Sequence, residues 1–415
     1  MGWVTLGLIV ISFIGMKVLL INHFPLEGSG SGTYTRDVAA FLIKGGHQVS
    51  LVFPENVVPQ ELPGAQVCPV FCGQGNGLAC ALPFNFPCFT THPRSTTTFA
   101  DLRADELAQY LEVFDSAITE EIETFKPDII HVQHIWFLSY LACKHGLPCV
   151  ITAHGTDLMG HEKWPEFRSY AEEAVERCDR IITISKDNYQ ATMALYPQAR
   201  DKTVLLSNGY NNDIFYPQPV DRHSLLAHYE LPDLGQRIIL FAGKMTAFKG
   251  LDVLLHAAQR YEAAQPGAFM TVIAGSGQEE ENLHRLAKEL GLESVHFIGH
   301  QDQASLRRLY STADVFVMPS RSEAFGLVAL EAMACGLPVV ASRVGGLPDF
   351  VNSEVGTLAE GGNPDSLAQA ILAELRNISL DPQRKTKVAQ YALEHYSMTH
   401  YISQLEEIYR SVISG

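Results

Sequence analysis

Two glutamates bracket an apolar stretch in the second half of the chain. In "SEAFGLVALEAMACG", Glu323 and Glu331 stand on either side of a run that contains Phe325, Gly326 and Leu327. A helix is expected to begin at Phe325 or Gly326, which leaves free backbone N–H groups between the two carboxylates. A carboxylate repels a phosphate but accepts two hydrogen bonds from a diol. The pattern predicts a sugar near Glu323 and a ribose near Glu331, although a helix cap and a solvated side chain would also explain it.

Two lysines precede this stretch in a second strand-to-helix connection. "FAGKMTAFKGLDVLL" places Lys244 just after a predicted strand and Lys249 just before a predicted helix. Two ammonium groups near a helix N-terminus suit a diphosphate, whereas two solvated lysines on a loop would have the same spacing. Farther on, "IAGSGQEEENL" contains Gly275 and Gly277 in a turn where a nucleotide can approach the backbone closely.

The first half carries a glycine-rich turn and a histidine after a strand. In "HFPLEGSGSGTYTRDVAAFL", Gly30, Ser31 and Gly32 open a predicted helix. The dinucleotide pattern G-x-G-x-x-G is not met, because Thr33 stands where the last glycine belongs. "VITAHGTDL" ends a predicted strand with His154. A single histidine at such a place is usually structural.

Alternating strands and helices predict an α/β chain with two doubly wound halves. Buried runs such as "KVLLIN", "DIIHV", "RIILFAG" and "DVFVMPS" are each followed by a helical pattern, and "YNNDIFYPQPV" reads as the connection between the halves. We expect an apolar extension over 1–15, one domain over 16–210, a second over 211–385 and a C-terminal helix over 386–415 that can pack back on the first domain. A long irregular stretch, 54–100, interrupts the first half. Ligands in such folds bind at the carboxyl ends of the strands, here in the cleft between the halves.

Composition excludes some classes of protein. The net charge of -16 over 415 residues argues against nucleic-acid binding. Eight cysteines at this length do not make a disulfide scaffold, and the cluster from Cys68 to Cys88 is read as small apolar residues in preference to a metal site. The extension lacks a basic start and a cleavage site, so it is an upstream segment or a weak membrane anchor. We expect a cytoplasmic location, with peripheral membrane contact left open.

The order of these motifs resembles a known enzyme family. Lys244, Lys249, "AGSG" and "SEAFGLVALEAMACG" followed by "LPVV" recur in this order in the retaining nucleotide-sugar glycosyltransferases of family four, the "group 1" transferases. The resemblance covers nearly the whole chain from Met16. It implies the GT-B fold, in which two Rossmann-like domains face a central cleft.

The resemblance implies a role for each motif in the second half. Lys244 and Lys249 would neutralise the donor diphosphate, Glu323 would contact the transferred hexose, and Glu331 would hold the ribose. The backbone N–H groups of 325–327, with Gly275 and Gly277, would lie against sugar and phosphate. The family usually has arginine where this chain has Lys244, and a lysine lacks the bidentate fork.

It also implies roles in the first half. Gly30, Ser31 and Gly32 would face the donor diphosphate, and His154 would bond the hexose near the reacting carbon. Asp157 is either a helix cap or an acceptor contact, and Ser185 caps the following helix.

The predicted activity is transfer of a hexose, with retention, from a nucleoside diphosphate sugar to a hydroxyl of a small-molecule, glycan or lipid-linked acceptor. No D-x-D motif follows a predicted strand, so we expect no metal ion and no cofactor. The resemblance implies that the leaving phosphate takes the acceptor proton. Two alternatives remain, a sugar-nucleotide epimerase of the same fold and a non-enzymatic two-lobed sugar-binding protein. The sequence indicates neither the donor base nor the oligomeric state.

Overall fold

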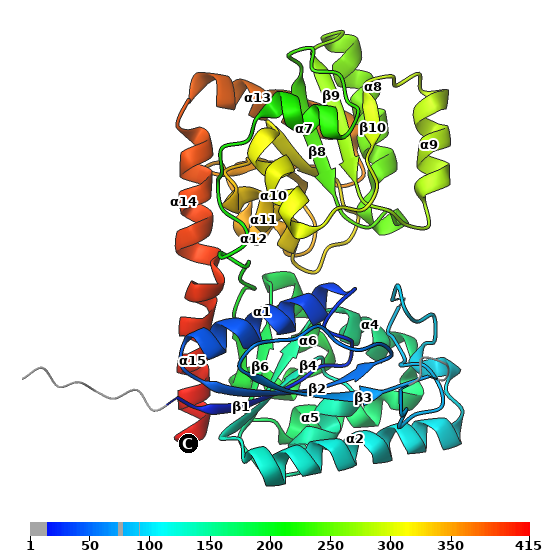
Figure 1. The fold of residues 1–415 in the computed structure, drawn as a ribbon, viewed down its shortest axis with the longest axis vertical. Coiled ribbons are helices and arrows are strands. Elements are labelled where there is room, and N and C mark those ends of the chain that lie inside the picture. Colours follow the sequence, from blue (N-terminus) through cyan, green and yellow to red (C-terminus); the bar gives the residue numbers. More distant parts are fainter. Residues whose placement is uncertain (1–14, 74–77, 91) are drawn as a thin grey trace, which may run out of the picture. The chain divides into compact units, whose positions relative to one another are not determined.

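A computed structural model of the chain describes residues 15–73, 78–90 and 92–415. Its strands form two sheets (Figure 1). The neighbouring strands among β1 to β5 and among β8 to β13 are parallel. The first sheet has the order β3-β2-β1-β4-β5-β6-β7 and the second has the order β10-β9-β8-β11-β12-β13. Of the predicted apolar extension, residues 1–14 lie outside the described part of the chain.

The strands are short. Those of the first sheet are β1 (Lys17–Ile21), β2 (Gln48–Glu55), β3 (Ala65–Phe71), β4 (Ile129–Gln133), β5 (Cys149–Ala153), β6 (Arg180–Thr183) and β7 (Thr203–Leu205). Those of the second sheet are β8 (Arg237–Ala242), β9 (Phe269–Ala274), β10 (Val295–Phe297), β11 (Val315–Met318), β12 (Val339–Ser342) and β13 (Gly356–Ala359).

Helices connect most successive strands, whereas β2 leads to β3 without one. They are α1 (Gly30–Lys44), α2 (Ala104–Phe125), α3 (Phe137–Cys143), α4 (Thr156–Lys163), α5 (Arg168–Arg177), α6 (Lys186–Leu195), α7 (Arg222–His228), α8 (Leu251–Ala264), α9 (Glu280–Glu289), α10 (Gln303–Thr312), α11 (Leu327–Ala334), α12 (Leu347–Phe350), α13 (Pro364–Leu380), α14 (Arg384–Tyr396) and α15 (Met398–Ile413). Four short 3-10 helices are η1 (Phe99–Asp101), η2 (Pro165–Phe167), η3 (Pro197–Lys202) and η4 (Ala247–Lys249). Within the part that the structure describes, no helix is both long and apolar enough to cross a lipid bilayer.

The prediction of an irregular stretch over 54–100 was wrong at residues 65–71, which form strand β3. This strand pairs with β2 in register from Val49↔Ala65 to Glu55↔Phe71. It lies at the edge of its sheet and contains Pro69, a residue that lacks a backbone N–H and is tolerated at sheet edges. The strand was not predicted because its proline and its partly exposed residues interrupt the continuous apolar run that is typical of a buried strand.

The second sheet is buried on both faces, which explains its continuous apolar strands. On β8, Leu240 belongs to a core with residues of α10 and α11, while Ile239 and Phe241 belong to a core with residues of α8 and α13. Neighbouring strand residues point to opposite faces, so the five apolar residues that follow Arg237 on this strand serve both cores. The predicted α/β class with two doubly wound sheets is confirmed.

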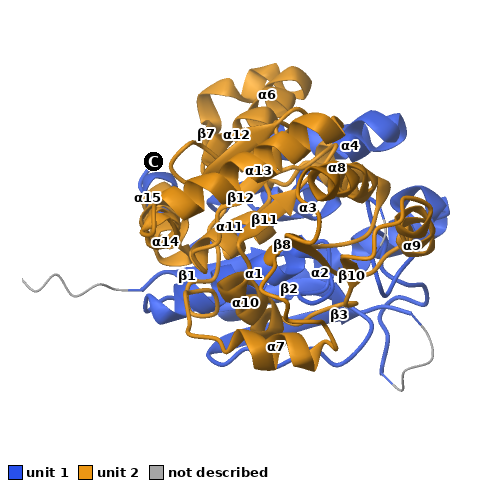
Figure 2. Cartoon of the chain, turned by 90° about the horizontal axis from the view of Figure 1, so that it is seen from above, with its two compact units in different colours: residues 1–152, 159–181, 409–415 blue, residues 153–158, 182–408 orange. Residues whose placement is uncertain are grey.

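Contacts between residues divide the chain into two compact units (Figure 2). The first comprises residues 1–152, 159–181 and 409–415, and the second comprises residues 153–158 and 182–408. In the first unit, His131 on β4 bonds Tyr409 of α15 through Nδ1 at 2.7 Å and Thr152 through Nε2 at 2.8 Å. The domain boundaries expected at 15/16, 210/211 and 385/386 stay predictions.

Candidate active site

Lys249 and Glu323, two of the charged residues selected from the sequence, form an ion pair in the second unit. Lys249 ends η4, in the connection from β8 to α8, and Glu323 lies in the connection from β11 to α11. Lys249 Nζ donates to Glu323 Oε2 at 2.6 Å, with side chains 25% and 12% exposed. Because β8 and β11 are neighbours in a parallel sheet, their carboxyl ends bring the two turns to one edge.

A second charged pair braces the turn that carries Lys249. The Arg321 guanidinium bonds both carboxylate oxygens of Asp252 at 2.6 Å and donates to the Ala247 carbonyl at 3.1 Å. The Arg321 backbone N–H donates to Phe248 O at 2.7 Å. Residues on both sides of Lys249 are thus tied to the segment that leads into Glu323. The bidentate pair holds the pKa of Asp252 below its usual range.

A cavity adjoins this brace. It has a volume of about 310 Å³ and is lined by Thr246, Asp252 and Arg321 together with residues of α9. The residues that line it do not include the charged residues expected to bind the donor, which are Lys244, Lys249, Glu323 and Glu331.

Glycines that the sequence analysis did not select hold the Glu323 backbone. Gly346 N donates to Glu323 O at 3.2 Å, and a Cβ on Gly345, where φ is 51°, would lie 1.7 Å from the same oxygen. The glycine doublet follows directly after the segment "PVVASRV". This glycine pair after a predicted strand is the sequence feature that could have indicated the close approach to Glu323.

The helix between the two glutamates begins where the pattern indicated. Gly326 is the N-cap of α11 with φ 109°, and a Cβ there would lie 2.7 Å from Leu347 Cδ2. Phe325 is buried, with its ring 5.4 Å from that of Phe350. Leu327 is the first helical residue and is half-buried. Position 326 therefore requires glycine, both because of its positive φ and because a side chain would contact Leu347.

Glu331 lies on α11 in a partly buried setting. Burial and, secondarily, the charge of Glu331 raise the pKa of the Cys335 thiol to about 12 and that of the Tyr310 phenol well above its ordinary value. Arg307, stacked 4.6 Å above the Tyr216 ring, lowers the Cys335 pKa by a smaller amount. This carboxylate thus lies close enough to Tyr310 on α10 and to Cys335 at the end of α11 to affect both groups.

The two predicted turn glycines of the donor site have a structural cause. A Cβ on Gly275 would lie 1.9 Å from Gly243 O, and one on Gly277 would lie 2.4 Å from Met245 O. The ends of β8 and β9 approach too closely for side chains at these positions. Lys244, between Gly243 and Met245, has an exposed side chain.

His154 belongs to the second unit and lies in a fixed turn. Asp157 Oδ1 accepts from His154 N at 3.1 Å and from Gly155 N at 2.8 Å, so this carboxylate stabilises the turn before α4. A Cβ on Gly155 would lie 3.3 Å from Ala324 Cβ, which places the turn against the residue after Glu323. Burial lowers the pKa of the His154 imidazole to about 4.

Ser185 joins a helix start to the same segment. Its hydroxyl accepts from Asn188 N at 3.1 Å, as expected of the N-cap of α6, and donates to Ala324 O at 3.0 Å. The cap was predicted, whereas the contact with Ala324 was not, because nothing in the sequence brings two segments 139 residues apart together.

The glycine-rich turn lies in the first unit. Ser29 is the N-cap of α1 and accepts from Gly32 N at 3.0 Å. A Cβ on Gly32 would lie 2.0 Å from Pro25 O, whereas one on Gly30 would have no atom within 4 Å. Ser31 is a half-buried residue in the first turn of the helix.

The cysteines of the cluster differ in their surroundings. Cys72 and Cys88 are buried, and burial raises the pKa of Cys72 to about 12. Cys68 donates to Glu121 at 3.0 Å. Among residues 15–73, 78–90 and 92–415, no three His, Cys, Asp or Glu side chains gather as a group that could hold a metal ion.

Solved structures with the same fold are glycosyltransferases. Sucrose-phosphate synthase from Thermosynechococcus elongatus matches with a TM-score of 0.75 at 22% identity, over 96% of this chain and 99% of that one. Anabaena HepE, solved with UDP and glucose, matches with a TM-score of 0.70 at 19% identity, over 95% of this chain and all of that one. The two sheets of seven and six strands are those of a GT-B glycosyltransferase.

The family follows from the sequence comparisons. Residues 229–409 match the family described as glycosyl transferases group 1, and residues 28–213 match glycosyltransferase family 4. D-inositol 3-phosphate glycosyltransferase 2 of Catenulispora acidiphila is 32% identical over 322 residues, which cover 72% of this chain and 74% of that protein. The corresponding enzyme of Mycolicibacterium smegmatis is 31% identical over 337 residues, or 76% and 75% of the two chains. The chain belongs to the group 1 glycosyltransferase family, and the predicted resemblance is confirmed.

Proposed function

We propose that the protein transfers a hexose from a nucleoside diphosphate sugar to an acceptor hydroxyl, with retention and without a metal ion. The observation that carries this proposal is the contact between Lys249 and Glu323 at the strand ends of the second sheet. A cation beside a carboxylate can serve a phosphate and a sugar hydroxyl that are joined to each other. Family membership supports transfer over epimerisation and over binding without catalysis.

The proposed donor site takes its positive charge from side chains and from a helix start. Lys244 and Lys249 would meet the diphosphate together with the N–H groups at the start of α11, where the leaving charge develops in the transition state. Gly275, Gly277 and the N–H groups of Phe325, Gly326 and Leu327 would line it. Glu331, on the same helix as the last of these, would hold the ribose.

The proposed role of His154 is a neutral one. Its pKa of about 4 means that the imidazole carries no charge at pH 7. It would therefore bond a hydroxyl of the hexose as a neutral donor or acceptor. Asp157 holds its backbone. With no charged acid near the acceptor in this scheme, the leaving phosphate takes the acceptor proton.

Donor and acceptor classes are suggested by relatives. HepE was solved with UDP-glucose, and starch synthase IV of Arabidopsis thaliana was solved with ADP. Two relatives that are 32% and 31% identical to this chain are named D-inositol 3-phosphate glycosyltransferases. We therefore propose UDP-hexoses and ADP-hexoses as the first donors to assay, and a phosphorylated polyol as the first acceptor.

One experiment tests the proposal. UDP, ADP and GDP are screened by thermal shift, since a ligand at 100 times its dissociation constant adds about 2.7 kcal/mol of stability. The matching hexose donor is then incubated with acceptor in EDTA, and the anomeric configuration of the product is read by NMR. We expect a product with the donor's configuration and a rate unchanged by EDTA. Inversion, or activity lost in EDTA and restored by Mg²⁺ or Mn²⁺, would contradict the mechanism, and an epimerised donor would favour the epimerase.

A further inference from the structure

The turn from β1 into α1 contains a backbone carbonyl that accepts hydrogen bonds from two side chains. Gly28 adopts φ 87°, and Ser29 caps α1 through its bond from Gly32 N. The carbonyl of Glu27 comes just before these residues. This carbonyl belongs to the peptide plane that leads into Gly28, two residues before the first residue of α1.

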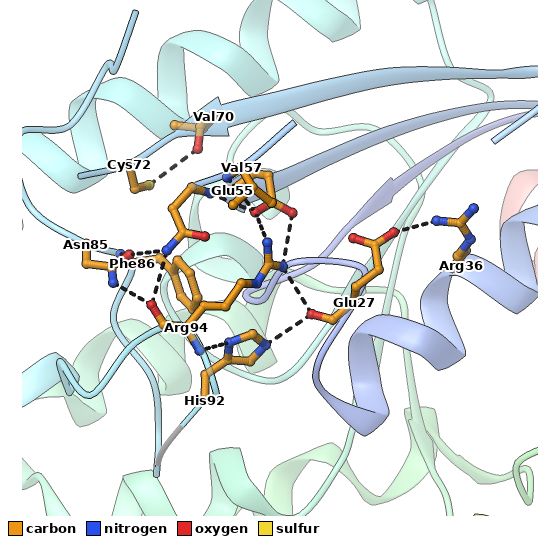
Figure 3. A network of polar contacts seen from close by, with 11 residues as sticks. Glu27, Arg36, Glu55, Val57, Val70, Cys72, Asn85, Phe86, His92 and Arg94 are labelled. Carbon is orange, nitrogen blue, oxygen red and sulfur yellow. Dashed lines mark hydrogen bonds and ion pairs between the residues drawn. The ribbon is translucent and has the colours of Figure 1, made fainter. Parts of the chain in front are cut away.

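Two side chains from the segment after β3 donate to that carbonyl (Figure 3). Arg94 Nη2 lies 3.1 Å and His92 Nε2 lies 3.2 Å from Glu27 O. The His92 ring is oriented by a second bond, because its Nδ1 accepts from Arg94 N at 3.2 Å. Since a carbonyl only accepts, the proton of a neutral His92 must be on Nε2. The ring edge also packs against Gly28, because a Cβ on that glycine would lie only 2.9 Å from His92 Cε1.

Arg94 is anchored independently of the turn. Its Nη1 lies 2.6 Å and its Nη2 lies 3.2 Å from the carboxylate of Glu55, a fully buried side chain at the end of β2. Glu55 Oε1 also accepts from Asn56 N at 2.7 Å. The Arg94 carbonyl accepts from Asn85 Nδ2 at 2.7 Å. Both ends of this residue are thus tied to the sheet edge and to the segment that follows it.

We propose that His92 and Arg94 are positioning residues that fix the glycine-rich turn, with Glu55 as their anchor. A purely structural role for Arg94 would end at neutralising the buried Glu55 carboxylate. The arrangement goes further, because Nη2 is shared between Glu55 and Glu27 O, and a second residue donates to the same oxygen. The consequence for catalysis rests on the proposed function, in which this turn faces the donor.

Two substitutions separate positioning from neutralisation. Arg94→Lys keeps a charge beside Glu55 but cannot serve both Glu55 and the Glu27 carbonyl with a planar fork. His92→Phe keeps a ring against Gly28 and removes the donor. Arg36→Lys is the matched control, because Arg36 bonds the Glu27 side chain and not its carbonyl. Amide hydrogen exchange over 28–33 is measured in the full chain, alongside kcat and the donor KM.

We expect exchange over 28–33 to rise about tenfold in both variants, since a net hydrogen bond is worth about that factor in an opening equilibrium. The Arg36→Lys control should stay within about twofold of the wild type. Unchanged exchange in His92→Phe, or a rise spread evenly over the first unit, overturns the inference. Faster local exchange with a lower kcat supports it together with the proposed function. Faster local exchange with unchanged kcat and KM supports the positioning role and overturns the assignment of this turn to the donor.

Discussion

Replacing Glu323 by alanine should separate the recognition of sugar from that of diphosphate. Glu323 pairs with Lys249 at 2.6 Å, and both side chains are mostly buried. A diphosphate that binds Lys249 must share or break this pair. Removal of the carboxylate frees the lysine and takes away a negative charge beside the phosphates.

The size of the effect follows from the pair. An ion pair of this kind is worth about 1 kcal/mol, the upper end for exposed pairs, so the affinity for a free nucleoside diphosphate should be unchanged or up to about fivefold tighter. The nucleotide sugar loses a hydrogen bond to a charged group, worth roughly 1.5–3 kcal/mol, so kcat/KM should fall about ten- to a hundredfold. Glu331→Ala should instead weaken the free nucleoside diphosphate by that same factor, because the ribose is held alike in ground and transition states.

The assay is calorimetry with the nucleoside diphosphate, alongside the transfer rate, for Glu323→Ala and Glu331→Ala. Glu289→Ala is the control, since Glu289 is an exposed carboxylate on α9 and its loss changes the net charge equally. An equal loss of diphosphate affinity in both variants would refute the separate sugar and ribose assignments. The start of α11 would then be a phosphate site flanked by two structural carboxylates.

The Arg321–Asp252 pair, the buried His23 and His154 lead to three other expectations. Arg321→Lys loses the fork that ties the Lys249 turn, so kcat/KM should drop about three- to tenfold with a melting temperature near that of the wild type, while Arg285→Lys on α9 should change neither. His23, whose burial lowers its pKa from 6.5 to about 3, binds a proton more readily when unfolded, so stability falls as the pH drops below 6.5. Chemical denaturation at pH 7 and pH 5 should show about 2 kcal/mol more loss in the wild type than in His23→Gln. His154 should contribute no ionisation to kcat/KM between pH 5.5 and 8, and a step there that vanishes in His154→Asn would contradict its low pKa.

The sequence predicted those parts of the fold that are buried on both sides. The strands β8 and β11 are continuous apolar runs because each faces two cores, and the rule for parallel sheets then placed Lys249 and Glu323 at one edge. The start of α11 was predicted within two residues, because Gly326 marks it.

What could not be predicted depends on contacts between distant segments. Arg321 and Asp252 are 69 positions apart, and neither stands in a pattern that names the other. The edge strand β3 was not predicted because Pro69 interrupts its apolar run. The bonds of His92 and Arg94 to one carbonyl lie in a segment that the sequence left irregular. In each case the partner is set by the register between elements, which composition and spacing do not encode.

The charge of the chain bears on how a donor would be selected. Lys244 and Lys249 are offset by Glu323 and Glu331, and the protein as a whole carries -16, so long-range attraction for a diphosphate is weak. Affinity must then arise at short range, from the N–H groups at the start of α11 and from a lysine already held in place by its pair. Inorganic phosphate can satisfy Lys249 only by leaving the Glu323 carboxylate without its partner. Under the proposed function, a nucleotide sugar would offer the phosphate and a hydroxyl together, so the Lys249–Glu323 pair would favour the intact donor over its fragments.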